Sequence, residues 1–184
     1  MVKKKKIAYV FYTKVLDRLS YTHKELSEVG DLLLAYGLEY LYGIRLESEK
    51  KGKGCHGKPY LINHPEIQYN ISHSGEYVVC VLSAMPVGID IQEKRVMDVT
   101  RVGKRVFKDE EYREFLMNED MQERFFRQWV LNESYLKWTG QGLTVDMREV
   151  ETHGWHQFLH VDKNYMCALW AEQPLEIVLK EIMV

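Results

Sequence analysis

The sequence predicts an α+β protein, because strand patterns and helix patterns occupy separate stretches of the chain. Apolar residues recur at helical spacing over 27–46 and 121–139, whereas β-branched and aromatic runs with turn residues between them fill much of the remainder. A proline and a glycine just after Met85 mark a switch between the two halves. We therefore expect two lobes, 1–85 and 86–184, each with helices and antiparallel strands, although no internal sequence repeat is visible.

The first half is expected to begin with a strand and a helix and to end with a hairpin. Ile7 to Tyr12 is β-branched and aromatic, which favours a strand. The next segment predicts a helix from Ser27 to Leu46, since its apolar residues return every three or four positions. Two further strand patterns, Ile67 to Ser72 and Tyr77 to Ser83, flank a turn at Gly75 and predict the hairpin.

The second half is expected to place one strand before a group of helices and three strands after them. Val87 to Ile91 is a short apolar strand pattern interrupted by one carboxylate. Helical spacing follows over Val99 to Val106, and Asp109 begins an acidic first turn that suits the helix dipole. A longer helix runs from Met121 to Thr139, where two glycines end it. The tail from Glu149 onward contains three strand-like runs.

Composition sets limits on the class of protein. With 184 residues, of which 46% are hydrophobic and 28% charged, the chain is long enough for a solid core. A formal net charge of -2 excludes the overall basicity of most nucleic-acid binders. Cys55, Cys80 and Cys167 lack the paired spacing of a disulfide or zinc framework, so we expect a reducing, cytoplasmic location. The basic start precedes an apolar run too short for a signal sequence or a membrane span.

Asp90 is the first candidate functional residue. On a strand, period two places Asp90 and Gln92 on one face and Ile89 and Ile91 on the other. A carboxylate on a mostly buried strand is costly unless it is paired or bound to a metal. Asp90 is therefore either a structural, ion-paired aspartate or a metal ligand.

Glu133 and Lys137 form the second candidate pair. Helical spacing places Trp129, Glu133 and Lys137 on successive turns of one face, beside an aromatic stripe. The ordinary alternative is an exposed ion pair worth about 0.3 to 0.5 kcal/mol. If the pair is buried, Glu133 and the distant Asp90 can share one divalent cation.

The segment Asn70 to Ser74 is a strand end with small polar residues and one imidazole. Ser72 and His73 are adjacent, so on a strand they face opposite ways and do not form a nucleophile and its base. They can donate hydrogen bonds to phosphate oxygens at the strand edge. A serine and a histidine satisfied within a turn are the alternative.

Two other patterns are rejected as sites. The segment Gly52 to Pro59 nearly forms a P-loop, but Pro59 replaces the hydroxyl residue that holds Mg²⁺, and the preceding stretch is too charged for a buried strand. Lys58 remains either a solvated loop lysine or a positioned phosphate contact. Three further histidines lack a metal-ligand pattern and are read as surface or strand residues: His153, His156 and His160.

The order of these segments resembles a known family. The chain looks like a 4′-phosphopantetheinyl transferase of the surfactin-synthetase type over roughly Gly30 to Leu143. Each motif alone is weak, but four in order are fairly specific. The motifs are Gly57-Lys58-Pro59, Asn70-Ile71-Ser72-His73-Ser74, Gly88-Ile89-Asp90, and Trp129 to Lys137 followed by Gly140-Gln141-Gly142-Leu143.

The resemblance implies both a fold and a reaction. Members of the family consist of two pseudo-symmetric α+β lobes with coenzyme A between them. They transfer 4′-phosphopantetheine from coenzyme A to a serine of an apo acyl or peptidyl carrier protein, with Mg²⁺ as the cofactor and 3′,5′-ADP as the leaving group. The same activity is therefore expected here.

The resemblance also implies roles for the metal and catalytic residues. Asp90 and Glu133 would hold Mg²⁺, Lys137 would neutralise charge on the phosphate oxygens, and Glu133 would help to deprotonate the serine. The family commonly has a second carboxylate where this chain has Gln92, whose amide oxygen is still able to ligate Mg²⁺. It also commonly has a lysine where this chain has Asn132.

By the same resemblance, Lys58, Ser72 and His73 would bind the nucleotide end of the coenzyme and its phosphates. An arginine that the family places near the start of the first long helix has no clear counterpart, with Lys24 or Leu26 nearby. The contacts at the adenine end are therefore not assigned.

Three hypotheses about function remain at this stage. The first is an active transferase, and the second is a non-catalytic module that binds coenzyme A or the carrier. The third is a nucleic-acid interaction protein, which the lack of aromatics among the basic residues disfavours. A basic patch after the Asp90 strand is either a solvated helix face or a surface that attracts acidic carriers; it consists of Lys94, Arg95, Arg101, Lys104 and Arg105.

Overall fold

The computed structural model describes residues 6–15, 21–142 and 145–183, and it has the expected α+β fold. The helices are α1 (His23–Tyr42), α2 (Val99–Gly103), α3 (Asp109–Leu116) and α4 (Met121–Thr139), with two 3-10 turns, η2 (Leu46–Ser48) and η3 (Met147–Glu149). The strands are β1 (Ile7–Lys14), β2 (Lys51–Lys53), β3 (Pro59–Leu61), β4 (Gln68–Ser74), β5 (Tyr77–Ser83), β6 (Val87–Glu93), β7 (Trp155–Leu159), β8 (Tyr165–Ala171) and β9 (Glu176–Glu181). Among the described helices, none is long and apolar enough to cross a membrane.

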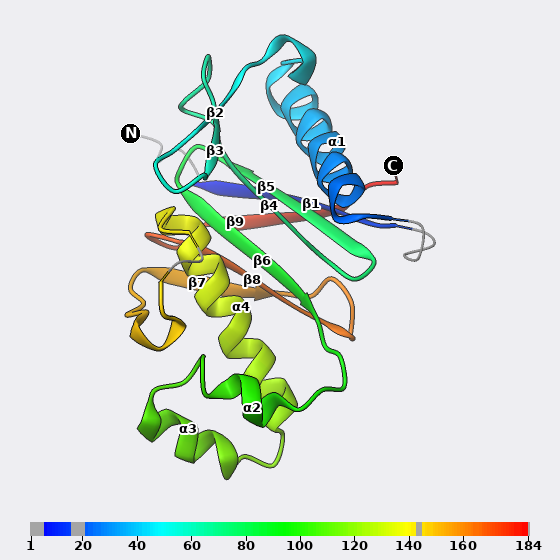
Figure 1. Ribbon diagram of the computed structural model, residues 1–184. Helices are drawn as coiled ribbons and strands as arrows, with labels where there is room; N and C mark the ends of the chain where they lie inside the picture. The colour runs from blue at the N-terminus through cyan, green and yellow to red at the C-terminus, as the bar shows by residue number, and fades with distance from the viewer. Residues whose placement is uncertain (1–5, 16–20, 143–144, 184) are drawn as a thin grey trace.

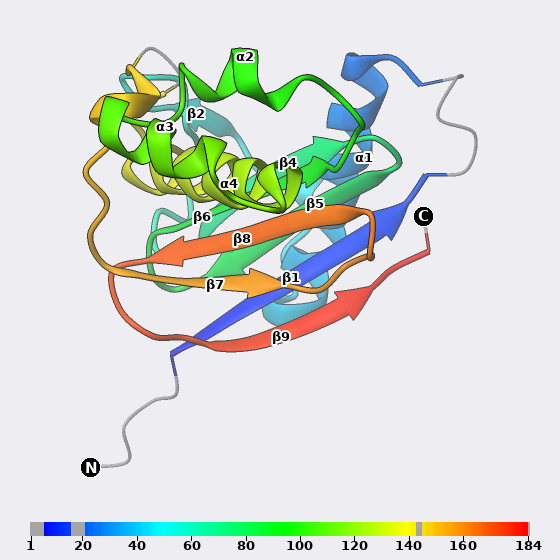
Figure 2. The same cartoon turned by 90° about the horizontal axis from the view of Figure 1, so that it is seen from below.

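Two sheets packed face to face form the centre of the molecule. The first sheet has the strand order β4-β5-β1-β9, and the second has the order β6-β8-β7. Apolar side chains of β1 and β5 meet those of β6 and β8 in one core cluster. Helix α1 covers the outer face of the first sheet and α4 that of the second, with α2 and α3 beyond α4 (Figure 1 and Figure 2). The layers are therefore helix, sheet, sheet and helix.

Helix α1 begins and ends earlier than its apolar pattern predicts. The expected start was Ser27, but a capping box sets the start at His23. The Thr22 hydroxyl accepts a hydrogen bond from Glu25 N, and the Glu25 carboxylate accepts one from Thr22 N. The expected end was Leu46, but Gly43 takes the left-handed conformation at φ 68° and ends the helix at Tyr42.

Most other elements agree with their sequence patterns. Helix α4 spans Met121 to Thr139 as expected, and Gly140 follows it at φ 72°. Strands β4 and β5 form the expected antiparallel hairpin with Gly75 in its turn. The predicted helix from Val99 to Val106 is shorter, since α2 ends at Gly103.

The tail forms three strands as expected, but the last strand belongs to a different sheet from the other two. Strands β7 and β8 join β6, whereas β9 pairs in parallel with β1 in the first sheet. Leu175, just before β9, is buried in the core between the sheets. The first sheet thus contains a strand from 86–184, while the division of the chain into lobes at residue 86 remains a prediction.

The two sheets are joined along one edge by side chains rather than by backbone pairing. Strand β8 pairs with one edge of β6, and β4 lies along the other edge. Alternate side chains of β4 accept hydrogen bonds from alternate backbone N–H groups of β6, an arrangement we call the seam. Its three bonds run from Ile89 N to Asn70 Oδ1 (3.0 Å), from Ile91 N to Ser72 Oγ (3.4 Å) and from Glu93 N to Ser74 Oγ (3.0 Å).

Gly88 allows helix α4 to lie directly on strand β6. A Cβ atom at this position would be 2.1 Å from the carbonyl oxygen of Ser134 and 2.3 Å from the backbone nitrogen of Trp138. Both obstacles are helix backbone, which cannot rotate away. The close approach therefore requires glycine. It brings the helix over Asp90, which lies two positions further along β6 on the same face.

We predict that Gly88→Ala lowers the free energy of unfolding by about 3 kcal/mol, the upper end of ordinary overpacking costs, because strand and helix must separate. Denaturant unfolding followed by circular dichroism measures the change. Gly54→Ala is the matched control, since its Cβ would make only an ordinary 3.5 Å contact. A Gly88→Ala protein as stable as this control would contradict the assigned packing.

Candidate active site

Asp90 lies where β6, β4 and α4 meet. It is only 5% exposed, and its Oδ1 atom accepts hydrogen bonds from Ser72 Oγ and Lys137 Nζ, each at 2.7 Å. Ser72 and Lys137 are themselves 2.7 Å apart, so the three polar groups form a closed triangle. Residues 72, 90 and 137, far apart in the sequence, are thus brought to one point.

The alternation of β6 explains the direction of the Asp90 side chain. Ile89 and Ile91 are buried in the core between the sheets, as period two predicts. Gly88 and Asp90 face α4 instead, because Gly88 lies against the helix backbone. Asp90 is thus buried and ion-paired with Lys137, while its role as a metal ligand stays a prediction.

Glu133 is also buried, at 7% exposed, on the same side of α4 as Lys137. Burial raises its pKa to about 7, and the nearby Asp90 carboxylate adds to this rise while Lys137 opposes it. The alternative of an exposed pair between Glu133 and Lys137 is excluded, because Glu133 is buried and the ion pair of Lys137 is with Asp90. Two carboxylates therefore face one ammonium group.

One oxygen of Asp90 is left over in this arrangement. Its Oδ2 is a buried atom that has no hydrogen-bond partner among the residues described. A buried carboxylate oxygen is costly in this state unless something else binds it. In the described part of the chain, no group of three or more His, Cys, Asp or Glu side chains could hold a metal. Mg²⁺ needs only one or two protein carboxylates and keeps several waters, so the pair of carboxylates fits this ion.

Gln92 follows Asp90 on the same face of β6. Its Nε2 atom donates to Ser74 Oγ at 3.1 Å, which leaves its amide oxygen as the atom available for a ligand. Gln92 also lines a cavity of about 130 Å³ together with Arg95 and Trp129. The structure therefore places Gln92 near the carboxylates but gives it a protein partner of its own.

Lys58 reaches across from the loop before β3 to two other elements. Its Nζ atom donates to the carbonyl oxygen of Val87 at 3.1 Å and to that of Trp138 at 3.0 Å. Burial lowers its pKa to about 8. Strand β3 begins at Pro59, so no helix follows Lys58 as a P-loop would require, and the rejection of that motif is confirmed.

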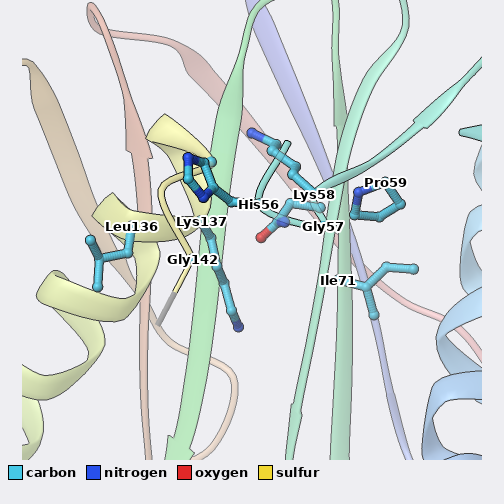
Figure 3. A pocket seen from close by; sticks show the side chains of 10 residues that line it. His56, Gly57, Lys58, Pro59, Ile71, Leu136, Lys137 and Gly142 are labelled. Atoms are coloured by element: carbon cyan, nitrogen blue, oxygen red, sulfur yellow. The ribbon is translucent and has the colours of Figure 1, made fainter. Parts of the chain in front are cut away.

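Lys58 and Lys137 line the same cavity. It has a volume of about 240 Å³ between the loop before β3, strand β4 and the end of α4. In Figure 3, His56 and Lys58 come from the loop before β3 and Lys137 comes from α4, and the ammonium ends of the two lysines point in opposite directions. The lining residues are His56, Gly57, Lys58, Pro59, Asn70, Ile71, Leu136, Lys137, Gly140 and Gly142.

Ser72 and His73 point in opposite directions, as their adjacency on a strand predicts. Ser72 belongs to the triangle with Asp90, whereas the His73 ring meets the edge of His23 on α1 at 4.6 Å. Burial lowers the pKa of His73, and His23 and Lys137 add to this effect. Among the described residues, neither Ser72 nor His73 lines the 240 Å³ cavity.

Sequence reasoning did not single out two residues that the structure brings to the cavity, Asn70 and His56. The signal for Asn70 was present in the alternation of Asn70, Ser72 and Ser74, which are polar at every second position of β4. His56 has no comparable signal, since it reaches the cavity only because its loop lies against Gly142.

The remaining histidines agree with expectation, and the reducing location expected from the cysteines stays a prediction. His153 is bonded to the hydroxyl of Tyr135 at 2.8 Å, and His156 stacks on Trp170 on strand β7, so both are surface or strand residues. The three cysteines are free: Cys55 is exposed, and Cys80 and Cys167 are buried.

Three members of the predicted basic patch, Arg95, Lys104 and Arg105, border hollows that Trp129 also lines. Lys94 forms an ion pair with Glu123 at 3.2 Å. The other four members, Arg95, Arg101, Lys104 and Arg105, are exposed. Lys104 and Arg105 line a surface hollow that Trp129 also borders, one helical turn from Glu133. The patch is thus both a solvated surface and a neighbour of the site.

Comparison with known proteins shows which family this part of the chain resembles. Residues 86–171, which contain β6, α4 and β8, match the model of the "4'-phosphopantetheinyl transferase superfamily". A 4′-phosphopantetheinyl transferase of Bacillus subtilis is 33% identical over 121 residues, which are 65% of this chain and 54% of that protein. The 4′-phosphopantetheinyl transferase gsp of Aneurinibacillus migulanus is 33% identical over 145 residues, 78% of this chain and 57% of that protein.

A eukaryotic relative is similar as well. The L-aminoadipate-semialdehyde dehydrogenase-phosphopantetheinyl transferase of Rattus norvegicus is 35% identical over 120 residues, which are 59% of this chain and 38% of that protein. The chain spans about half the length of the bacterial relatives that it matches. The resemblance seen in the motifs is thereby confirmed, and residues 86–171 place this part of the chain in the 4′-phosphopantetheinyl transferase superfamily.

Proposed function

We propose that the protein transfers 4′-phosphopantetheine from coenzyme A to a serine hydroxyl of an apo acyl or peptidyl carrier protein, with Mg²⁺ as the cofactor. The observation that carries the proposal is the unpartnered buried Oδ2 of Asp90 beside the Glu133 carboxyl, in a segment that matches the superfamily. In the reaction the serine oxygen attacks phosphorus, the pyrophosphate bond breaks, and 3′,5′-ADP leaves with the bonding electrons.

Asp90 and Glu133 would hold the metal ion, with Gln92 as a further oxygen donor. When bound, Mg²⁺ neutralises negative charge on the pyrophosphate. Lys137 is held in place by Asp90 and Ser72, so its ammonium group is preorganised to stabilise charge that develops on the phosphate oxygens. The site thus works by positioning and electrostatics, as phosphoryl transfer generally does.

Glu133 is the general base in this proposal. Its carboxylate lies beside Asp90 and Lys137, where it can accept a proton from a group that attacks the phosphate. It would take the proton of the incoming serine hydroxyl, directly or through one water, as the new bond to phosphorus forms. Asp90 is less suited to this role, because one of its oxygens already accepts two hydrogen bonds.

The 240 Å³ cavity is proposed to receive part of the nucleotide end of coenzyme A. It is smaller than an ordinary pocket for a whole ligand, so it would enclose one portion of the coenzyme only. Lys58 brings positive charge to its wall and would contact a phosphate. Ser72 and His73 remain proposed contacts of the phosphates, on the two faces of β4 beside the cavity.

The carrier protein is proposed to approach over the basic patch. The exposed cations of the patch would attract the acidic surface of a carrier and steer its serine toward Glu133. The free cysteines fit a reducing compartment, and we propose that the protein works in the cytoplasm.

A second candidate function is a non-catalytic module that binds coenzyme A or a carrier. It is favoured by Gln92 in place of a carboxylate, and by the use of Asn132 in packing. Asn132 is 2% exposed, accepts from Gln128 at 2.9 Å and donates to the carbonyl of Met147 at 3.3 Å. Its side chain thus anchors the η3 turn on α4.

The direct test is to incubate the purified protein with coenzyme A, Mg²⁺ and an apo carrier, and to measure the intact mass of the carrier. We expect a gain equal to one phosphopantetheine group that disappears when EDTA is added. Coenzyme binding without any gain in carrier mass would favour the non-catalytic module instead.

We predict that Glu133→Gln lowers kcat at least about 100-fold, because the proton acceptor is lost and the oxygen that faces the metal loses its negative charge. The melting temperature should not fall, since the amide is nearly isosteric and carries no charge to bury. Glu114→Gln is the matched control, because Glu114 is exposed on α3 and pairs with Arg124. Equal loss of activity in both variants would contradict the role of Glu133.

We also predict that coenzyme affinity falls as the pH rises through about 8. Burial depresses the pKa of Lys58 to this range, so its ammonium is fully present below pH 8 and is lost above it. The phosphates of the coenzyme are already ionised near pH 8, so their own titration does not hide the loss of the Lys58 charge. Calorimetric titrations from pH 7 to pH 9 on the protein and on Lys58→Met measure it; parallel slopes for the two proteins would overturn this assignment.

A further inference from the structure

Asn70 belongs to both the seam and the cavity. It lies on β4, is 5% exposed, and accepts the hydrogen bond of Ile89 N at 3.0 Å. It is also one of the residues that line the 240 Å³ cavity. Ser72 and Ser74 make the equivalent seam bonds but do not line this cavity, within the part of the chain that the structure describes.

The seam fixes which way the Asn70 amide is turned. A backbone N–H only donates, so the atom that meets Ile89 N must be the carbonyl oxygen Oδ1. The amide nitrogen Nδ2 is therefore the other end of the group. This orientation follows from the donor and does not depend on distinguishing nitrogen from oxygen.

The amide nitrogen is left with its hydrogens free. Among the described residues, no acceptor contacts Asn70 Nδ2. The buried polar atoms without a partner are Glu49 Oε2, Tyr69 OH and Asp90 Oδ2, so Asn70 Nδ2 is not fully buried. Because Asn70 lines the cavity and its amide nitrogen is neither hydrogen-bonded nor fully buried, we infer that this nitrogen is accessible from the cavity.

Two other side chains on the cavity wall, those of Lys58 and Lys137, are also donors. Lys58 and Lys137 carry ammonium groups, and each already makes two hydrogen bonds within the protein. An ammonium group has three donors, so each lysine retains one. A wall with these donors and the Asn70 amide suits a ligand that offers several acceptors and negative charge.

We propose that Asn70 is a binding residue of the cavity, which donates from Nδ2 to a phosphate oxygen at the nucleotide end of coenzyme A while the seam holds its oxygen in place. The proposal rests on the proposed function, since coenzyme A is the donor substrate there. Because Ile89 immediately precedes Asp90, the same side chain links the bound nucleotide to the strand that carries the metal-site carboxylate.

The test compares Asn70→Ser with Ser74→Ala. Serine makes seam bonds at positions 72 and 74, so Asn70→Ser is expected to retain an acceptor for Ile89 N while removing the amide donor. Ser74→Ala removes a seam acceptor of the same kind away from the cavity. Binding of coenzyme A and of 3′,5′-ADP is measured by calorimetry in EDTA, so that metal binding plays no part, and unfolding is measured in parallel.

We expect Asn70→Ser to weaken the binding of both ligands about tenfold, the effect of losing one hydrogen bond to a charged group. Ser74→Ala should bind both ligands as the unmodified protein does, although its melting temperature falls. A third variant, Asn70→Asp, retains the seam acceptor and places a carboxylate toward the phosphate, so it should weaken binding further than Asn70→Ser.

The outcomes separate this proposal from the one on which it rests. Unaltered affinity in Asn70→Ser or Asn70→Asp, or equal weakening in Ser74→Ala, would overturn the role of Asn70 while leaving the proposed transferase intact. If the unmodified protein bound neither ligand, the coenzyme donor itself would be wrong, and the assignment of Asn70 would fall with it.

Discussion

The arrangement of the site depends on the seam between β4 and β6. A strand at the edge of a sheet has a row of N–H groups that must find acceptors, and β6 is such a strand in the second sheet. Side chains of β4 supply these acceptors, so the two sheets are joined at a corner without merging into one. Asp90 lies at this corner, so the contact between the two sheets and the candidate active site coincide.

The charges at this corner do not balance within the protein. Ser72 ties the seam to Asp90 and Lys137, and Lys137 compensates the Asp90 carboxylate. Burial raises the pKa of Glu133 to about 7, the Asp90 carboxylate adds to the rise, and Lys137 opposes it only in part. A buried pair of carboxylates with one ammonium group and one unpartnered oxygen is short of positive charge. A divalent cation would supply it, whereas a purely structural ion pair would need no second carboxylate.

Local patterns predicted the pieces of this site better than their assembly. Helix α4 and the outward direction of Asp90 follow from spacing within a few residues, and the structure confirms both. The capping box at Thr22 is equally local, but it lies before the apolar pattern from which the helix start was predicted. The place of β9 beside β1 and the bonds of Lys58 had no local signal, because they join residues brought together only by the complete fold. The sequence therefore predicted which side chains are functional candidates, but not which residues they contact in the folded protein.

Lys58 lines the cavity and also links the two elements that carry the carboxylates. The carbonyl of Trp138 belongs to the last turn of α4, where carbonyl oxygens lack helical partners and the dipole is negative, so a cation there stabilises the helix end. The carbonyl of Val87 lies at the start of β6. Lys58 thus holds together the two elements that carry Asp90, Glu133 and Lys137. Since two of its three donors are used in this way, a phosphate in the cavity can bind the third without releasing either element.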